Sequence, residues 1–258
     1  MYNIQNVSRS AAANRVFQAL NITCTLTATC DTIHTSLLVP DLGLDQVRGW
    51  AMVDADGSLR SLPGAQACFD APAGCGPRGF VQHPGLPDLA YMICELDGSL
   101  VTFRLPAAGG EDGLVPLQTH KTYPAEAPGG ADGGWPDRWA SAIAITPDGG
   151  YLYCGNRRQP GDERPGAGDV FTIFRVGADG MLALVGHFDH KATGLHTRNM
   201  QVVEGEGAGG TAVLWLVVAH QDNDTLAVYA LDRASGAVLG EAATAKVPSA
   251  GNVCVRAN

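Results

Sequence analysis

The sequence predicts an all-β protein built from repeated four-stranded antiparallel units, and three observations support this. Runs in which β-branched and aromatic residues alternate with small or polar ones recur along the chain, as the two faces of a strand require. Turn signals separate these runs, and turn-forming residues are abundant, with 33 Gly and 15 Pro among 258 residues. A turn glycine also recurs at a nearly regular interval, which indicates an internal repeat.

The clearest unit runs from Ala140 to Phe188. Its strand-like segments are joined first by Pro147-Asp148-Gly149, then by an Arg/Pro/Gly-rich loop, and last by Ala178-Asp179-Gly180. These are residue types that reverse the chain. The four predicted strands are Ala142–Thr146, Tyr151–Gly155, Val170–Val176 and Leu182–Phe188.

The same pattern precedes and follows this unit. The preceding copy has predicted strands at Gly79–Gln82, Leu89–Cys94, Leu100–Leu105 and Gly113–Leu117. The following copy has them at Asn199–Val203, Val213–Ala219, Thr225–Leu231 and Ser235–Val238. The turn glycine before the last strand recurs at intervals of 56, 67 and 56 residues, at Gly57, Gly113, Gly180 and Gly236. Four antiparallel strands at this period predict the blades of a β-propeller, with a β-sandwich as the alternative.

A fourth, damaged unit is predicted near the beginning of the chain. His34–Val39 reads as a first strand and Val47–Val53 as a third, so most of a second strand is expected to be missing between them. We therefore expect an incomplete propeller of about four recognisable blades. Because each open end of such an arc exposes a strand edge and an apolar face, self-association through the open propeller edges is also expected.

Composition excludes some classes of function. The formal net charge is −9, so no excess positive field exists to hold nucleic acid or a membrane surface. No apolar run approaches the ~20 residues of a transmembrane helix. The seven Cys form no C-x-x-C and show no zinc-ligand spacing, which favours a reducing cytoplasm and predicts no metal. Cys94, Cys154 and Cys254 are expected to be buried thiols, whereas pairing of Cys68 with Cys75 is left open.

Several stretches carry a family resemblance. They are "GPRGFVQHP" (Gly76–Pro84), "ICELDGSLVTF", "DRWASAIAITPDGGYLYCGNR", "TRNMQVV" and "VVAHQDNDTLAVYAL". In this order they resemble the seven-bladed β-propeller lactonase family, which includes bacterial 6-phosphogluconolactonase and fungal carboxy-muconate cyclases. The resemblance covers about His34 to Val255 and implies a propeller domain over 34–258. It leaves 1–33 unassigned, with a disordered or transit-like composition. The family's chains are longer, and two of its pattern residues are replaced here, by Gly79 and Ala142.

In a propeller, the starts of first strands and the ends of second strands converge at one mouth of the central channel. By position and by resemblance, the expected catalytic residues are Glu95, His34 and Arg78. The expected substrate-binding residues are Arg157, Arg198, Arg138 and His220. Lactone hydrolysis needs a base to activate water and donors to stabilise an oxyanion, and an anionic substrate needs a cationic anchor. Glu95 or His34 is the expected base, and the arginines are the expected clamps.

The resemblance implies hydrolysis of a small anionic sugar-acid lactone without a metal or cofactor, with 6-phosphogluconolactone as the expected substrate. Two alternatives remain open at this point. One is a muconate-type lactonising cyclase that uses the same pocket. The other is a catalytically inactive propeller fragment that acts as a binding module.

Overall fold

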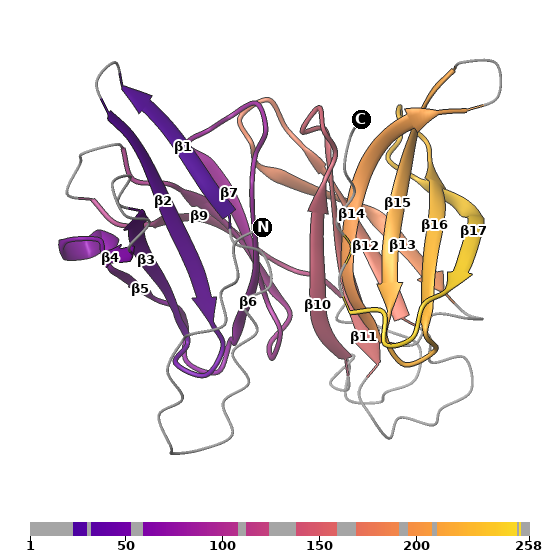
Figure 1. Cartoon of the computed structure of the whole chain (residues 1–258), viewed down its shortest axis with the longest axis horizontal. Coiled ribbons are helices and arrows are strands. Elements are labelled where there is room, and N and C mark those ends of the chain that lie inside the picture. The colour runs from indigo at the N-terminus through magenta and orange to yellow at the C-terminus, as the bar shows by residue number, and fades with distance from the viewer. Residues whose placement is uncertain are drawn as a thin grey trace.

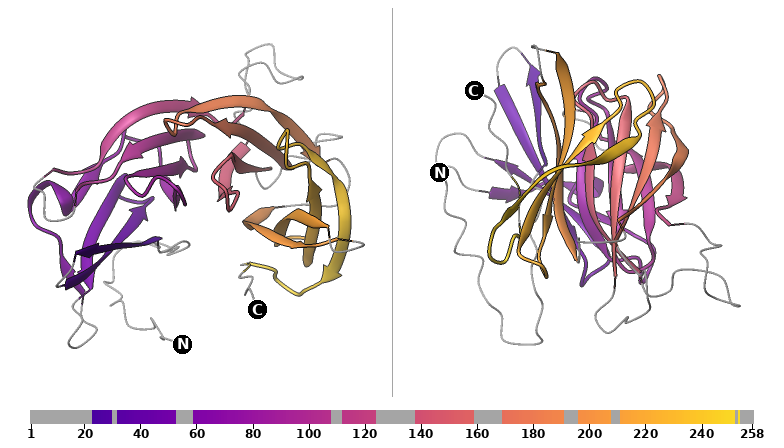
Figure 2. Two further views of the ribbon diagram at one scale, coloured as in Figure 1. Left: turned by 90° about the horizontal axis from the view of Figure 1, so that it is seen from above. Right: turned by 90° about the vertical axis from the view of Figure 1, so that its right-hand side faces the viewer.

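A computed structural model describes residues 23–29, 32–52, 59–107, 112–123, 138–158, 169–190, 196–207, 211–251 and 253. These residues form four antiparallel sheets that follow one another around an open arc (Figures 1 and 2). One short 3-10 helix, η1 (Gly64–Gln66), lies in the first sheet region. No helix in the described ranges has the length and apolar character needed to cross a bilayer. The predicted all-β, blade-based fold is confirmed.

The sheets keep the order of the sequence. The first contains β1 (Thr23–Thr29), β2 (Thr32–Asp41), β3 (Gln46–Met52) and β4 (Leu59–Ser61), with β5 (Cys68–Asp70) also paired to β3. The second contains β6 (Pro77–Gln82), β7 (Leu89–Cys94), β8 (Ser99–Arg104) and β9 (Val115–Lys121). The third contains β10 (Arg138–Ile145), β11 (Tyr151–Arg158), β12 (Asp169–Val176) and β13 (Leu182–His190). The fourth contains β14 (Thr197–Glu206), β15 (Ala212–His220), β16 (Thr225–Leu231) and β17 (Val238–Lys246).

The first sheet differs from its prediction. The segment expected to be a first strand is β2, which is the second strand of the sheet because β1 precedes it and pairs with it, His34 lying opposite Thr27. The prediction that this blade lacks a second strand is therefore wrong. Residues 23–29 read TCTLTAT, where β-branched Thr favours a strand but few large apolar residues mark it as one. The turn glycine predicted at Gly57 lies outside the described residues.

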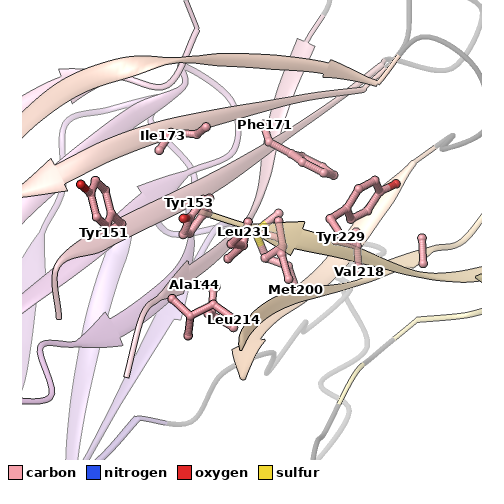
Figure 3. Packing of buried hydrophobic residues seen from close by; sticks show 14 residues of the cluster. Ala144, Tyr151, Tyr153, Phe171, Ile173, Met200, Leu214, Val218, Tyr229 and Leu231 are labelled. Carbon is pink, nitrogen blue, oxygen red and sulfur yellow. The ribbon is translucent and has the colours of Figure 1, made fainter. Parts of the chain in front are cut away.

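Three apolar cores lie between successive sheets. The core between the first and second sheets includes Val47 and Phe103, and the next contains Ile143 and Phe174. The core between the third and fourth sheets is rich in aromatic residues, with Tyr153, Phe171, Met200, Leu216 and Tyr229 (Figure 3). The strands β6 to β8, β11 and β12 are buried on both faces because each sheet is packed between two others, and so they read as nearly continuous apolar runs.

The recurring turn glycine is explained by contact between blades. The Tyr91 hydroxyl donates to the carbonyl of Gly180 on the following blade at 2.9 Å. Tyr153 does the same to Gly236 at 2.8 Å. Both glycines have φ near +75°, at 78° and 71°. A Cβ on Gly180 would lie 2.1 Å from Leu89, so backbone conformation and close packing both require glycine there.

One face of the fourth sheet has no further blade against it in the described chain (Figure 2). Counted along the second strand from the pair at each bulge, Ala140–Asn156 and Thr197–His220, Trp215 and Val217 occupy the positions of Tyr151 and Tyr153 in the third sheet. In the third sheet those positions contact the turn of the next blade. Trp215 is half-buried. This face, Trp215 with Val217, is therefore built like the blade faces that are covered elsewhere in the molecule.

Candidate functional site

The first strand of each of the last three sheets begins with a β-bulge. The pairing register shifts between Pro77 and Gly79, and it shifts at the equivalent places in β10 and β14. The extra residues at these three bulges are Arg78, Ser141 and Arg198. A bulge leaves one residue outside the ladder and re-aims its side chain, which is how strand starts come to serve a site.

At the first of these bulges lies a buried charge cluster that joins two blades. Arg78 Nε is 2.8 Å from Glu95 Oε2, and Arg157 Nη2 of the next blade contacts Glu95 Oε1. The three residues are only 4%, 7% and 3% exposed, for Arg78, Glu95 and Arg157 respectively. We call them the Arg–Glu–Arg cluster. Two guanidinium groups share one carboxylate, so the cluster has an excess positive charge that favours an anion.

The guanidinium of Arg157 has unused hydrogen-bond donors. Its Nε and Nη1 are buried and have no hydrogen-bond partner in the described part of the chain, and its Cζ lies 5.4 Å from the centre of the Trp139 ring. Burial lowers the pKa of Arg157, and it lowers that of Arg78 to about 9, while the Glu95 carboxylate opposes both shifts. With a pKa of about 9, Arg78 stays cationic at neutral pH. A buried cation with unused donors is suited to holding a substrate oxygen.

Arg198 lies beside this cluster. Its carbonyl accepts a hydrogen bond from Arg78 Nη2 at 3.4 Å, and its own charge contributes to lowering the pKa of Arg78. The structure thus brings Arg78, Glu95, Arg157 and Arg198 together at the ends of β6, β7, β11 and β14, as the convergence of strand ends predicts.

His196 was missed by sequence reasoning. It has a φ of 70°, which is uncommon outside glycine, and its Nδ1 is 3.5 Å from Asp222 Oδ2. Burial lowers its pKa, and the positive charges of Arg157 and Arg198 add to this, while Asp222 and Asp169 oppose it. The imidazole is therefore neutral at pH 7 and able to accept a proton. The only sequence signal was its place two residues before Arg198.

The predicted substrate-binding residue His220 belongs to a separate hydrogen-bonded group. Its Nδ1 is 3.3 Å from Thr197 Oγ1 and 4.0 Å from Asp169 Oδ2, and its Nε2 is 3.2 Å from the Tyr229 hydroxyl. Asp169 also accepts from the backbone N–H of Thr197. Both ring nitrogens of His220 thus have protein partners, and the side chain is 1% exposed. This arrangement holds the junction of the third and fourth sheets.

Two predicted site residues are placed only by their backbone. His34 lies in β2, and Arg138 begins β10 opposite Arg158. The side chains of both lie outside the described part of the structure.

The fold and this mouth define a β-propeller with a cationic, anion-attracting site. The family described as "Lactonase, 7-bladed beta-propeller" matches residues 27–256, and the chain belongs to that family. It is 36% identical over 213 residues to the 6-phosphogluconolactonase of Sodalis glossinidius, covering 82% of this chain and 54% of the relative. It is 32% identical to that of Yersinia pestis, covering 81% and 53%. The chain thus spans about half the length of these curated relatives.

The solved structures agree in fold. The periplasmic gluconolactonase of Pseudomonas aeruginosa has a TM-score of 0.61 and 28% identity, with 83% of this chain and 52% of that chain covered. A protein from Lactobacillus plantarum has a TM-score of 0.62 and 26% identity, with 84% and 54% covered. These matches support the arrangement of the four sheets as consecutive blades.

Proposed function

We propose that this chain hydrolyses a sugar-acid lactone, and that 6-phosphogluconolactone is its substrate. The observation that carries the proposal is the Arg–Glu–Arg cluster, which combines excess positive charge with unused donors on buried Arg157. Support for the substrate comes from the names of the relatives in Sodalis and Yersinia. The cluster suits both the carboxylate that ring opening creates and the oxyanion that precedes it.

In this mechanism water attacks the lactone carbonyl, and the Arg157 donors hold the developing oxyanion. We place proton acceptance on His196, whose Nδ1 lies 3.5 Å from Asp222 Oδ2, because a neutral imidazole can take a proton from the attacking water. Glu95 has each oxygen against a guanidinium and acts here by holding Arg78 and Arg157 in place. The bond between the carbonyl carbon and the ring oxygen then breaks, and the ring oxygen leaves as an alcohol by taking the proton that His196 accepted. Arg198, at the edge of the cluster, anchors the phosphate.

The test is the rate of lactone opening in the purified protein compared with the spontaneous rate. Glu95→Gln and Arg157→Lys should each reduce the enzymatic part at least 10²-fold, as is typical when a preorganised donor is lost. Glu204→Ala, a change at an exposed residue paired with Arg233, is the matched control and should leave the rate unchanged. A folded protein that gives only the spontaneous rate would reject hydrolysis and favour the inactive binding module. Turnover of a muconate substrate instead would favour the cyclase.

Replacing Arg198 tests binding of the substrate phosphate separately from the hydrolysis step. Arg198→Ala should raise KM for the phosphorylated lactone several-fold and leave KM for the unphosphorylated gluconolactone nearly unchanged, because only the first carries the anchored charge. Equal effects on both lactones would remove the phosphate role from Arg198. They would leave the hydrolase proposal standing.

We also propose that a second copy of this chain covers the half-buried Trp215 on the outer face of the fourth sheet, where the neighbouring Val217 is already buried within the chain. Support comes from the register of β15, where these residues occupy the positions that receive the next blade in the third sheet. Sedimentation should show a dimer, and Trp215→Glu should shift it to monomer. Leu239→Glu, at a 66% exposed apolar residue on the outermost strand, is the control and should leave the dimer intact. A wild-type monomer at every concentration would overturn this proposal.

A further inference from the structure

Two cysteines that the candidate mechanism does not use lie directly against each other. Cys75 Sγ and Cys94 Sγ are 2.6 Å apart, and their residues are 1% and 0% exposed within the core between the first and second sheets. Backbone hydrogen bonds also tie the segment just before β6 to the segment just after β7. The carbonyl of Cys75 accepts from Leu96 N–H at 3.1 Å, and that of Gly76 accepts from Glu95 N–H at 2.7 Å. The pair is therefore fixed by strand pairing as well as by packing.

Asp97 lies near enough to these sulfurs to suggest a metal site among the described residues. Two observations argue against one. Tetrahedral zinc holds its sulfurs at about 2.3 Å from the metal, which places two thiolates roughly 3.8 Å apart, well beyond the separation here. The Asp97 carboxylate is also already engaged by Ser99 Oγ at 2.6 Å and by Lys121 Nζ at 3.0 Å. The geometry fits a bond between the sulfurs better than chelation by them.

We propose that Cys75 and Cys94 form an intramolecular disulfide when the protein meets a peroxide or a small disulfide oxidant. With hydrogen peroxide, one thiolate takes an oxygen to give a sulfenic acid, and the hydroxide that leaves is protonated to water. The second thiol then attacks the sulfenic sulfur, forming the S–S bond and releasing a second water. Two thiols and one peroxide give one disulfide and two waters. With a small disulfide, two exchange steps give the same bond and two small thiols.

The surroundings of the two thiols determine how fast this disulfide forms and which segments it joins. The hydrogen bond with Cys75, followed by burial, raises the pKa of the Cys94 thiol, so the thiolate is scarce and oxidation is slow at neutral pH. Both thiols are at most 1% exposed, so only a small oxidant is expected to reach them. The bridge ties residue 75, three positions before Arg78, to residue 94, which directly precedes Glu95. It therefore joins the two backbone segments that carry Arg78 and Glu95, two of the three members of the Arg–Glu–Arg cluster, whatever reaction that cluster serves.

Peptide mapping tests the proposal without any activity assay. The folded protein is incubated with hydrogen peroxide or 2-hydroxyethyl disulfide, then unfolded, alkylated and digested with trypsin. Cleavage after Arg60, Arg78 and Arg104 places Cys75 in peptide 61–78 and Cys94 in peptide 79–104. The expected result is a linked pair of these peptides, lost on reduction. If, after incubation with the oxidant, both peptides are recovered unlinked with every cysteine alkylated, the proposal is overturned.

Peptide 61–78 also contains Cys68, so matched variants must assign the sulfur. Cys68→Ser should keep the linked peptides, and Cys75→Ser should lose them. Cys154→Ser, at another buried thiol, should leave the link unchanged. Loss of the link in Cys68→Ser would place the bond at Cys68 and refute the assignment. Cys68 Sγ is 3.9 Å from Asp70 Oδ1, whereas Cys75 Sγ contacts Cys94 Sγ. We therefore expect the link to persist in Cys68→Ser and to be lost in Cys75→Ser.

Discussion

The junction between the second and third sheets and the junction between the third and fourth are built alike at one end and differently at the other. At the turn end, a tyrosine of each preceding blade donates to a turn glycine of the next, Tyr91 to Gly180 and Tyr153 to Gly236. At the mouth, the first junction holds the Arg–Glu–Arg cluster. The second holds the hydrogen-bonded group around His220. The repeat therefore fixes the scaffold, and individual residues at the mouth decide the chemistry.

Register explains why the mouths differ. At the three bulges Pro77 pairs with Cys94, Ala140 with Asn156 and Thr197 with His220. The next residue of the second strand is Glu95 in the second sheet, Arg157 in the third and Gln221 in the fourth. Equivalent positions on neighbouring blades lie side by side around the channel. Glu95 and Arg157 consequently meet as opposite charges, whereas Arg157 and Gln221 cannot form an ion pair.

Removing the shared carboxylate should have the largest effect. Glu95→Ala leaves two buried guanidinium groups without their anion, and breaking a buried pair in this way destabilises a protein by about 3–5 kcal/mol. Urea unfolding should show this loss of free energy of unfolding. Gln221→Ala, at the equivalent position of the other junction, should change stability by less than about 1 kcal/mol. Equal losses at the two positions would mean that the mouths do not differ as described.

Replacing His196 should have the next largest effect, on rate. His196→Gln should reduce kcat about 10²-fold, equivalent to about 2.7 kcal/mol, because it removes a general base. Since burial and nearby arginines depress the pKa of His196, the active neutral form is present at neutral pH and is lost only as pH falls below 6.5. The rate profile should therefore decline on the acid side below pH 6.5. The same decline in the variant would assign it to another group.

The smallest effect tests the end at which the junctions are alike. Tyr91→Phe and Tyr153→Phe each remove one hydroxyl donor from a buried turn carbonyl, which should destabilise the protein by about 1 kcal/mol. The two losses should agree within a few tenths of a kcal/mol in urea unfolding. A loss of more than about 2 kcal/mol in only one of them would show that the two junctions also differ at the turn end.

The blades could be predicted because hydrophobic alternation and turn glycines are local signals. The mouth was predicted in part, since the convergence of strand ends placed Arg78, Glu95, Arg157 and Arg198 together. Which arginines bind Glu95 could not be predicted, because the partner Arg157 is 62 residues away and the bulges that aim the side chains leave no mark in the sequence. His196 was missed because its position depends on an unusual backbone φ. The strand β1 was missed because its sequence lacks large apolar residues.

The bulges at the mouth have an evolutionary consequence. The residue that each bulge adds contributes nothing to the strand ladder, so changing it leaves the pairing of the blade intact. Arg78, Ser141 and Arg198 occupy three such positions. In the third sheet the Ser141 hydroxyl donates a hydrogen bond to the carbonyl of Gly155 on its own blade, at 3.0 Å. Substitutions at these bulge positions can therefore change which charged ligands a propeller of this kind binds, one residue at a time, while the blades themselves are kept.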